Sequence, residues 1–139
     1  MIVLATNVVS EPISARTSAA VMDWLDRQAA ETLFLTSVSL AELLVGVEIL
    51  PLGKRRNTLG SALGELLTTL FAERILPFDE KAARAYAGIF ASARESGRAL
   101  SFADAQIASI AKVHGCAVAT RDAAPFLAAG VPVIDPWSA

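Results

Sequence analysis

This chain of 139 residues has one cysteine, one histidine and no excess of positive charge, and each of these features argues against a class of function. The single cysteine, Cys116, has no partner for an intrachain disulfide. With one histidine, His114, the sequence also offers no Cys and His cluster for zinc. The formal net charge of -2 argues against indiscriminate nucleic-acid binding, which needs many cationic contacts to phosphates. Any such contact must rest on local patches.

Long apolar runs are missing as well. The segment 43–52 is interrupted by Glu48 and closed by Pro51, and it falls far short of the ~20 apolar residues that span a bilayer. The N-terminus has no basic segment followed by an apolar core and a small-residue cleavage site. We therefore expect no membrane association and a cytoplasmic location.

What the sequence does contain predicts a single α/β domain over residues 1–139. Hydrophobic residues make up 54% of the chain and charged residues 19%, which favours a sheet covered on both faces or a buried oligomer interface. Short β-rich segments alternate with longer helical ones, as in a parallel sheet with crossover helices. The expected strands are 2–5, 33–37, 75–78, 116–120 and 131–134. The expected helices are 18–30, 40–50, 54–72, 81–96, 102–114 and 123–128, with Gly97 and Gly115 as C-terminal caps.

One short pattern occurs twice, each time at an expected helix start. Residues 39–43 and 101–105 both read Ser, apolar, Ala, acid, apolar. A structural role explains the pattern on its own: the serine is the N-cap, and the acid three residues later bonds back to the cap amide. Asp122, between a strand and a helix, has a similar explanation as a cap.

The functional alternative depends on where Glu42, Asp104 and Asp122 fall together. The first two are expected in first helical turns and the third directly after a strand, positions that meet at one edge of an open α/β sheet. Three converging carboxylates repel one another unless a cation neutralises them. Mg²⁺ or Mn²⁺ is the natural candidate, because hard divalent ions prefer oxygen ligands.

Four segments carry a resemblance to a known family. MIVLATNVVSE at the start, SLAELLVG at 39–46, SGRALSFADAQIAS at 96–109 and VATRDAAPFLAAGVPVIDPW at 118–137 resemble the PIN-domain ribonucleases, and among them the VapC-type toxins. The resemblance spans the chain in order. It implies a PIN-like three-layer α/β/α fold, with a parallel five-stranded sheet in the order 3-2-1-4-5, and Mg²⁺-dependent endoribonuclease activity.

The family's four acidic positions fall on Ala5, Glu42, Asp104 and Asp122, so this chain departs from the pattern at the first. Relatives carry Asp directly before Thr-Asn, whereas this chain has alanine. Position 5 is therefore that of a missing metal ligand and catalytic acid, and we expect activity to be impaired. Two origins fit the alanine: an engineered replacement that makes a self-poisoning nuclease easier to produce, which the intact surroundings favour, and a natural degenerate copy.

The resemblance also implies roles for polar and cationic neighbours. Thr6, Asn7 and Thr120 are candidates for hydrogen bonds that orient the acids, although turn residues have a structural explanation too. Arg94 and Arg98, just before Ser101, are candidates for RNA phosphate contacts. The cationic run 54–56 is either a solvated helix start or an RNA contact, and Trp24 and Trp137 either stack on bases or are buried.

The implied partners are those of a toxin-antitoxin pair. We expect a VapB-type antitoxin, an RNA substrate, a homodimer, and operator DNA bound only through the antitoxin complex. Two other functions stay open at this point: a PIN-like binding module that cleaves nothing, and a metal-dependent phosphatase or DNA nuclease.

Overall fold

The computed structural model describes residues 1–139, and the five expected strands form one parallel sheet in the order β3-β2-β1-β4-β5. The predicted strand order is therefore confirmed. The strands are β1 (Ile2–Leu4), β2 (Leu33–Thr36), β3 (Ile75–Leu76), β4 (Ala117–Ala119) and β5 (Val133–Ile134). Leu4 is in register with Ala119, and all neighbouring strands are parallel, so their carboxyl ends share one edge of the sheet.

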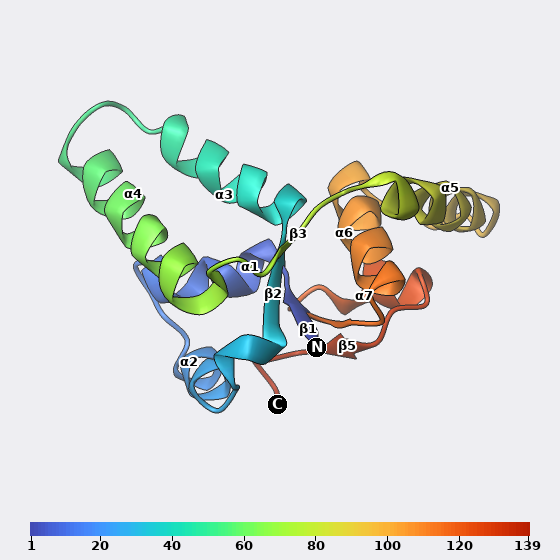
Figure 1. Ribbon diagram of the computed structural model, residues 1–139, viewed down its shortest axis with the longest axis horizontal. Helices are drawn as coiled ribbons and strands as arrows, with labels where there is room; N and C mark the ends of the chain where they lie inside the picture. Colours follow the sequence, from blue (N-terminus) through green and yellow to red (C-terminus); the bar gives the residue numbers. More distant parts are fainter.

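Helices cover both faces of this sheet, which gives the predicted three layers (Figure 1). They are α1 (Thr6–Val9), α2 (Ala19–Asp26), α3 (Ser37–Glu48), α4 (Lys54–Leu66), α5 (Glu80–Glu95), α6 (Phe102–Val113) and α7 (Ala123–Ala128), with short turns η1 (Glu11–Ile13), η2 (Ala30–Thr32) and η3 (Leu67–Phe71). Figure 1 shows α1 to α4 on one side of the sheet and α5 to α7 on the other.

The core is divided by the sheet, because successive residues of a strand face opposite sides. Leu4 of β1 belongs to a buried cluster with Leu43 of α3 and Leu63 of α4. Its neighbours Val3 and Ala5 belong to the other cluster, with Ile107 of α6. The residue at position 5 therefore lies on the α6 side of the sheet.

Several helix boundaries differ from the expectation: α1 was not expected, α2 ends at Asp26 rather than at residue 30, and α3 and α4 differ as follows. Helix α3 begins at Ser37 rather than at residue 40, because the Thr36 hydroxyl accepts a hydrogen bond from the Ser39 amide at 3.1 Å and caps the helix. Ser39 is thus inside the helix and is not its N-cap. Helix α4 ends at Leu66, and the expected continuation to residue 72 is the wider π-helical turn η3, closed by Ala72 with φ of 47°.

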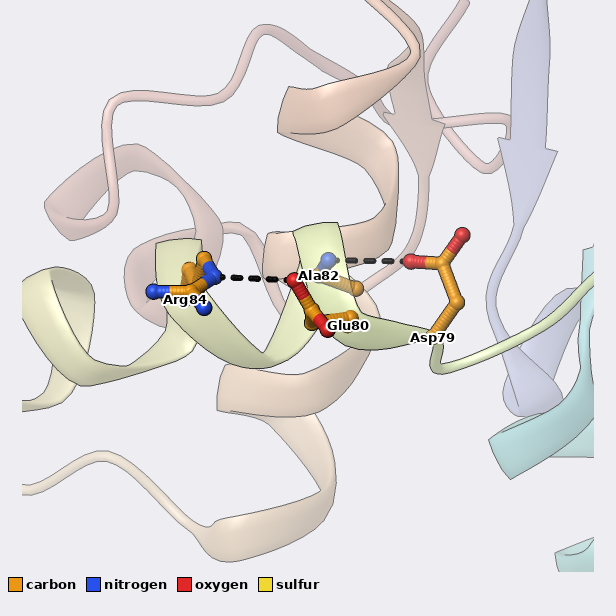
Figure 2. A network of polar contacts seen from close by, with 4 residues as sticks. All are labelled: Asp79, Glu80, Ala82 and Arg84. Carbon is orange, nitrogen blue, oxygen red and sulfur yellow. Dashed lines mark hydrogen bonds and ion pairs between the residues drawn. The ribbon is translucent and has the colours of Figure 1, made fainter.

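The start of helix α5 is fixed by local polar contacts, shown in Figure 2. The Asp79 carboxylate accepts a hydrogen bond from the Ala82 amide at 3.0 Å, and Arg84 pairs with Glu80 at 3.2 Å one turn away. Within α5, Tyr86, Phe90 and Arg94 are spaced four residues apart, so they lie on one face of the helix.

The predicted C-terminal glycine caps are confirmed. Gly97 after α5 and Gly115 after α6 have φ of 68° and 66°, a left-handed conformation that glycine adopts without strain. None of the helices is both long and apolar enough to cross a bilayer.

Candidate active site

Position 5 lies where strand β1 ends and helix α1 begins. The Ala5 amide donates to the Ala119 carbonyl of β4 at 2.9 Å, and the residue is 5% exposed. Its side chain packs in the core cluster on the α6 side. A methyl group there offers no donor, acceptor or charge, so the chemistry of this edge depends on the neighbours of Ala5.

Thr6, the first of those neighbours, reaches toward helix α3. Its Oγ1 lies 2.8 Å from Glu42 Oε1 and 3.0 Å from Ser39 Oγ. Because a carboxylate only accepts hydrogen bonds, the Thr6 hydroxyl is the donor to Glu42. Thr6 therefore joins the start of α1 to Glu42 of α3 by a side-chain hydrogen bond.

Glu42 is not a helix-cap residue, contrary to one interpretation of the repeated pattern. Helix α3 has no acid in its first turn, since it starts at Ser37 and Glu42 lies in the second turn. The placement in the first turn was wrong because Thr36, expected inside the strand, is the cap. The Glu42 carboxylate is exposed, and its hydrogen bond is to Thr6.

Asp104 does occupy the first turn of its helix. Ser101 is the N-cap of α6, and its hydroxyl accepts the Asp104 amide at 3.1 Å, as predicted. The return bond from the cap amide to the Asp104 carboxylate is not formed, and this half-exposed carboxylate has no hydrogen-bond or ion-pair partner in residues 1–139. Capping therefore explains Ser101 but leaves the acid free.

Asp122 is held by its backbone and not by its side chain. Its amide donates to Thr120 Oγ1 at 3.1 Å, and Asn7 Nδ2 donates to the same oxygen at 3.3 Å. Asp122 precedes α7, but its carboxylate makes no capping hydrogen bond. Thr120 is 1% exposed and joins α1 to the segment that carries Asp122. The two residues after Ala5 thus reach opposite sides, Thr6 to Glu42 and Asn7 to Thr120.

Asp104 and Asp122 line the same cavity, of about 590 Å³. Arg94 and Arg98, the two predicted phosphate contacts, line it as well. Two free carboxylates and two guanidinium groups therefore share one exposed hollow. This combination suits a phosphate-bearing ligand, because the arginines offset the repulsion between the acids and an anion.

Glu42 lines a different cavity, of about 850 Å³, between α3 and α4. Lys54 and Arg55 line this cavity too, whereas Arg56 pairs with Glu48 at 2.9 Å. Two of the three cations in run 54–56 thus face a hollow that contains an acid. Sequence reasoning gave no reason to pair them with Glu42, since only the packing of α3 on α4 brings them together.

The three predicted acids do not form a cluster in this chain. Nowhere in residues 1–139 do three or more His, Cys, Asp or Glu side chains lie close enough to hold a metal ion together. Carboxylate oxygens have the right chemistry for a hard divalent cation, but Asp104 and Asp122 are only two and Glu42 lies in another cavity. The residues present do not complete a metal site.

Comparison with known proteins identifies the fold that carries this site. The PIN domain family matches residues 2–130. The chain belongs to the PIN-domain family. VapC ribonuclease Y4jK from Sinorhizobium fredii is 49% identical over 138 residues, covering 99% of this chain and 98% of that protein. Toxin FitB from Neisseria gonorrhoeae is 44% identical over 137 residues, covering 99% of each chain.

Solved PIN-domain relatives share the whole architecture. FitAcB from Neisseria gonorrhoeae has a TM-score of 0.94 to this chain at 44% identity, with 100% of both chains covered. The structure of FitAB bound to an IR36 DNA fragment has a TM-score of 0.93 at 43% identity, covering 99% of this chain and 96% of that one. The resemblance inferred from the sequence is therefore confirmed for family and fold.

Proposed function

We propose that this chain is the toxin of a toxin-antitoxin pair, that its competent form is an endoribonuclease, and that Ala5 impairs the chain as it stands. The location of residue 5 carries the proposal. Residue 5 directly follows β1 on the α6 side of the sheet, and the next two residues, Thr6 and Asn7, contact Glu42 and Thr120 respectively. A carboxylate at this one position supplies the third acid that the structure lacks.

In the competent form, Asp at position 5, Asp104 and Asp122 would hold Mg²⁺ or Mn²⁺, and Glu42, which lines the other cavity, would join them through water. The bound ion would supply an activated water for phosphodiester hydrolysis, so no covalent nucleophile is needed. The remaining chemistry belongs to this chain. Arg94 and Arg98 bind the RNA phosphate beside the acids. Thr6, Asn7 and Thr120 fix the carboxyl-bearing segments in place.

The proposed protein partners follow from the relatives and from the surface. The solved structures of relatives include FitAcB and FitAB, and the FitAB structure includes a DNA fragment. We therefore propose a VapB-type antitoxin and DNA contact only through that complex. Leu44 and Val45 of α3 and its C-cap residue Ile49 are apolar and exposed. We propose that this face of α3 joins two copies of the chain in a homodimer, because burying it removes apolar area from water. An RNA substrate places the proposed activity in the cytoplasm.

One observation favours a second candidate, a PIN-domain binding module that no longer cleaves. The chain has two free acids in one cavity and no third beside them. Such a module would bind RNA or sequester an antitoxin without hydrolysis. The two candidates differ in what happens when an acid is placed at position 5.

The decisive experiment compares this chain with Ala5→Asp and, as a neutral control of similar size, Ala5→Asn. Each protein is incubated with RNA and with DNA, with and without Mg²⁺. We expect Ala5→Asp to cleave RNA faster by roughly two to three decades, because a lost metal ligand removes ~3 to 4 kcal/mol of transition-state stabilisation. Ala5→Asn and this chain should stay near background.

Equal rates in all three proteins would refute the role of position 5 and favour the binding module. Cleavage of DNA but not RNA would instead indicate a DNA nuclease. A further control, Asp104→Asn in the Ala5→Asp protein, should abolish the gained activity.

A further inference from the structure

Four aromatic side chains form a connected group that the proposed chemistry does not use. We call Phe78, Tyr86, Phe90 and Phe102 the aromatic cluster. Tyr86 is its centre: its ring centroid lies 5.9 Å from that of Phe78, 5.6 Å from Phe90 and 5.3 Å from Phe102. These separations lie within the attractive range for aromatic pairs. The Tyr86 and Phe90 rings are nearly parallel, at 18°, so the cluster is a packed platform and not a set of independent side chains.

Part of this platform is open to solvent. Phe102 is 67% exposed and Phe90 is 37% exposed, whereas Tyr86 and Phe78 are half-buried. The two exposed rings both pack on Tyr86, so they lose little conformational entropy on binding, because this neighbour already restricts them. The exposed rings are therefore prepared to stack on a flat ligand.

The aromatic cluster borders the cavity that holds the two free acids. Phe102, the first residue of α6, does not itself line the cavity, but it directly follows Ser101, which does, and its ring packs on Tyr86. Phe90 lines that cavity together with Arg94, which follows it by one turn on the same face of α5. The packing of α5 on α6 brings these residues together. Phe90 is thus the aromatic residue of the cavity wall, Phe102 lies next to that wall through Ser101 and Tyr86, and Arg94 and Arg98 supply positive charge in it.

The chemistry of this edge favours a single-stranded nucleic acid over a protein. Exposed rings take a base by stacking, and neighbouring guanidinium groups take the adjoining phosphate. A protein interface would need a wider apolar patch, yet Ser101 before Phe102 is exposed and Asp104, two residues after it, is half-exposed. Other exposed apolar residues, Leu44, Val45 and Ile49, lie on α3 and at its C-cap.

We propose that Phe102, supported by Tyr86 and Phe90, stacks on an unpaired RNA base next to the phosphate bound at Arg94 and Arg98. The inference rests on the proposed function and deepens it, since it names the group that selects an unpaired nucleotide. Stacking accepts any base, because every base has a π face. The aromatic cluster therefore selects for an unpaired, unstacked base and does not distinguish between the four bases.

The test measures binding of a fluorescein-labelled, single-stranded RNA of mixed sequence to this chain by fluorescence anisotropy in EDTA. Phe102→Ala should raise the Kd about tenfold or more. Phe102→Trp should keep the Kd within about threefold, because its ring also stacks, whereas Phe102→Leu should weaken binding as alanine does. Leu127→Ala is the matched control, since Leu127 is 59% exposed and lies outside the aromatic cluster.

A second arm uses RNAs with one abasic site, moved along the strand. One abasic position should weaken binding to this chain and have no further effect on Phe102→Ala, which shows that the ring and the missing base contact each other. Unchanged RNA affinity in Phe102→Ala, full affinity in Phe102→Leu, or no measurable RNA binding by this chain would overturn the proposal. A loss of molecular mass in light scattering of Phe102→Ala would overturn it too, because it would assign the ring to a contact between copies.

The two proposals fail in different ways. If Ala5→Asp cleaves RNA and adding Phe102→Ala leaves the rate and the cleavage pattern unchanged, the base platform is wrong and the ribonuclease stands. If Ala5→Asp cleaves nothing while the stacking signature is present, the ribonuclease is wrong and the chain is an RNA-binding module.

Discussion

Placing a carboxylate at position 5 should make the melting temperature of this protein depend on divalent metal. Ala5 lies on the α6 side of the sheet, the side on which Asp104 begins its helix, so on the proposed function an acid there would add a third oxygen ligand. Metal that binds only the folded state, at ten times its Kd, stabilises that state by about 1.4 kcal/mol. For a domain of this size, we expect a rise of about 4 to 6 °C in Tm.

The assay is a thermal melt in EDTA and in increasing Mg²⁺ or Mn²⁺, for this chain, Ala5→Asp and Ala5→Asn. In EDTA, Ala5→Asp should melt no higher than this chain, because a carboxylate added near other acids raises repulsion in the folded state. Metal should then raise the Tm of Ala5→Asp alone, and Asp104→Asn in that protein should remove the rise. Equal metal-induced shifts in all variants would refute the reasoning, since position 5 would then be no ligand.

Four further predictions test other parts of the structure. Thr6→Val in the Ala5→Asp protein removes the 2.8 Å hydrogen bond to the exposed Glu42. RNA cleavage should slow about tenfold, while the free energy of unfolding in urea changes by less than ~1 kcal/mol. An unchanged cleavage rate would show that Glu42 does not need this hydrogen bond. The affinity for an antitoxin tail, measured by calorimetry, should differ by less than about tenfold between this chain and Ala5→Asp, since one lost charge contact of ~1.4 kcal/mol is a factor of ten. Light scattering at micromolar concentration should give the mass of a dimer, and a clean monomer would contradict the proposed α3 interface. Burial raises the pKa of the Cys116 thiol, so the folded protein should react slowly with thiol reagents. The free energy of unfolding should fall as pH rises above about 8.5, because there the thiol ionises only in the unfolded chain. Cys116→Ala should not show this loss of stability at alkaline pH.

The fold could be predicted from the sequence because its signals are local. Ser101 at the start of an apolar helical repeat indicated the cap of α6. Gly97 and Gly115 indicated helix ends, and both have a left-handed backbone in the structure. The start of α3 was missed for an equally local reason. Thr36 is a β-branched residue that suits the end of a strand, yet its hydroxyl also caps the helix that follows without a loop.

The candidate site was predictable only residue by residue. Positions of acids can be read from a sequence, but which acids share a cavity depends on how helices pack. Asp104 and Asp122 line one cavity, while Glu42 lines another together with Lys54 and Arg55. The aromatic cluster had no sequence signal, since Tyr86 and Phe102 belong to separate helices and meet only through tertiary packing.

The edges of the sheet determine how copies of this chain can associate. Strands β3 and β5 lie at its two edges and are two residues long. So short an edge exposes few unpaired amides and carbonyls, and a second chain gains little by adding a strand to it. Association of two copies through a continuous sheet is therefore disfavoured. The helix surfaces remain for contacts between copies of this chain or with a partner protein.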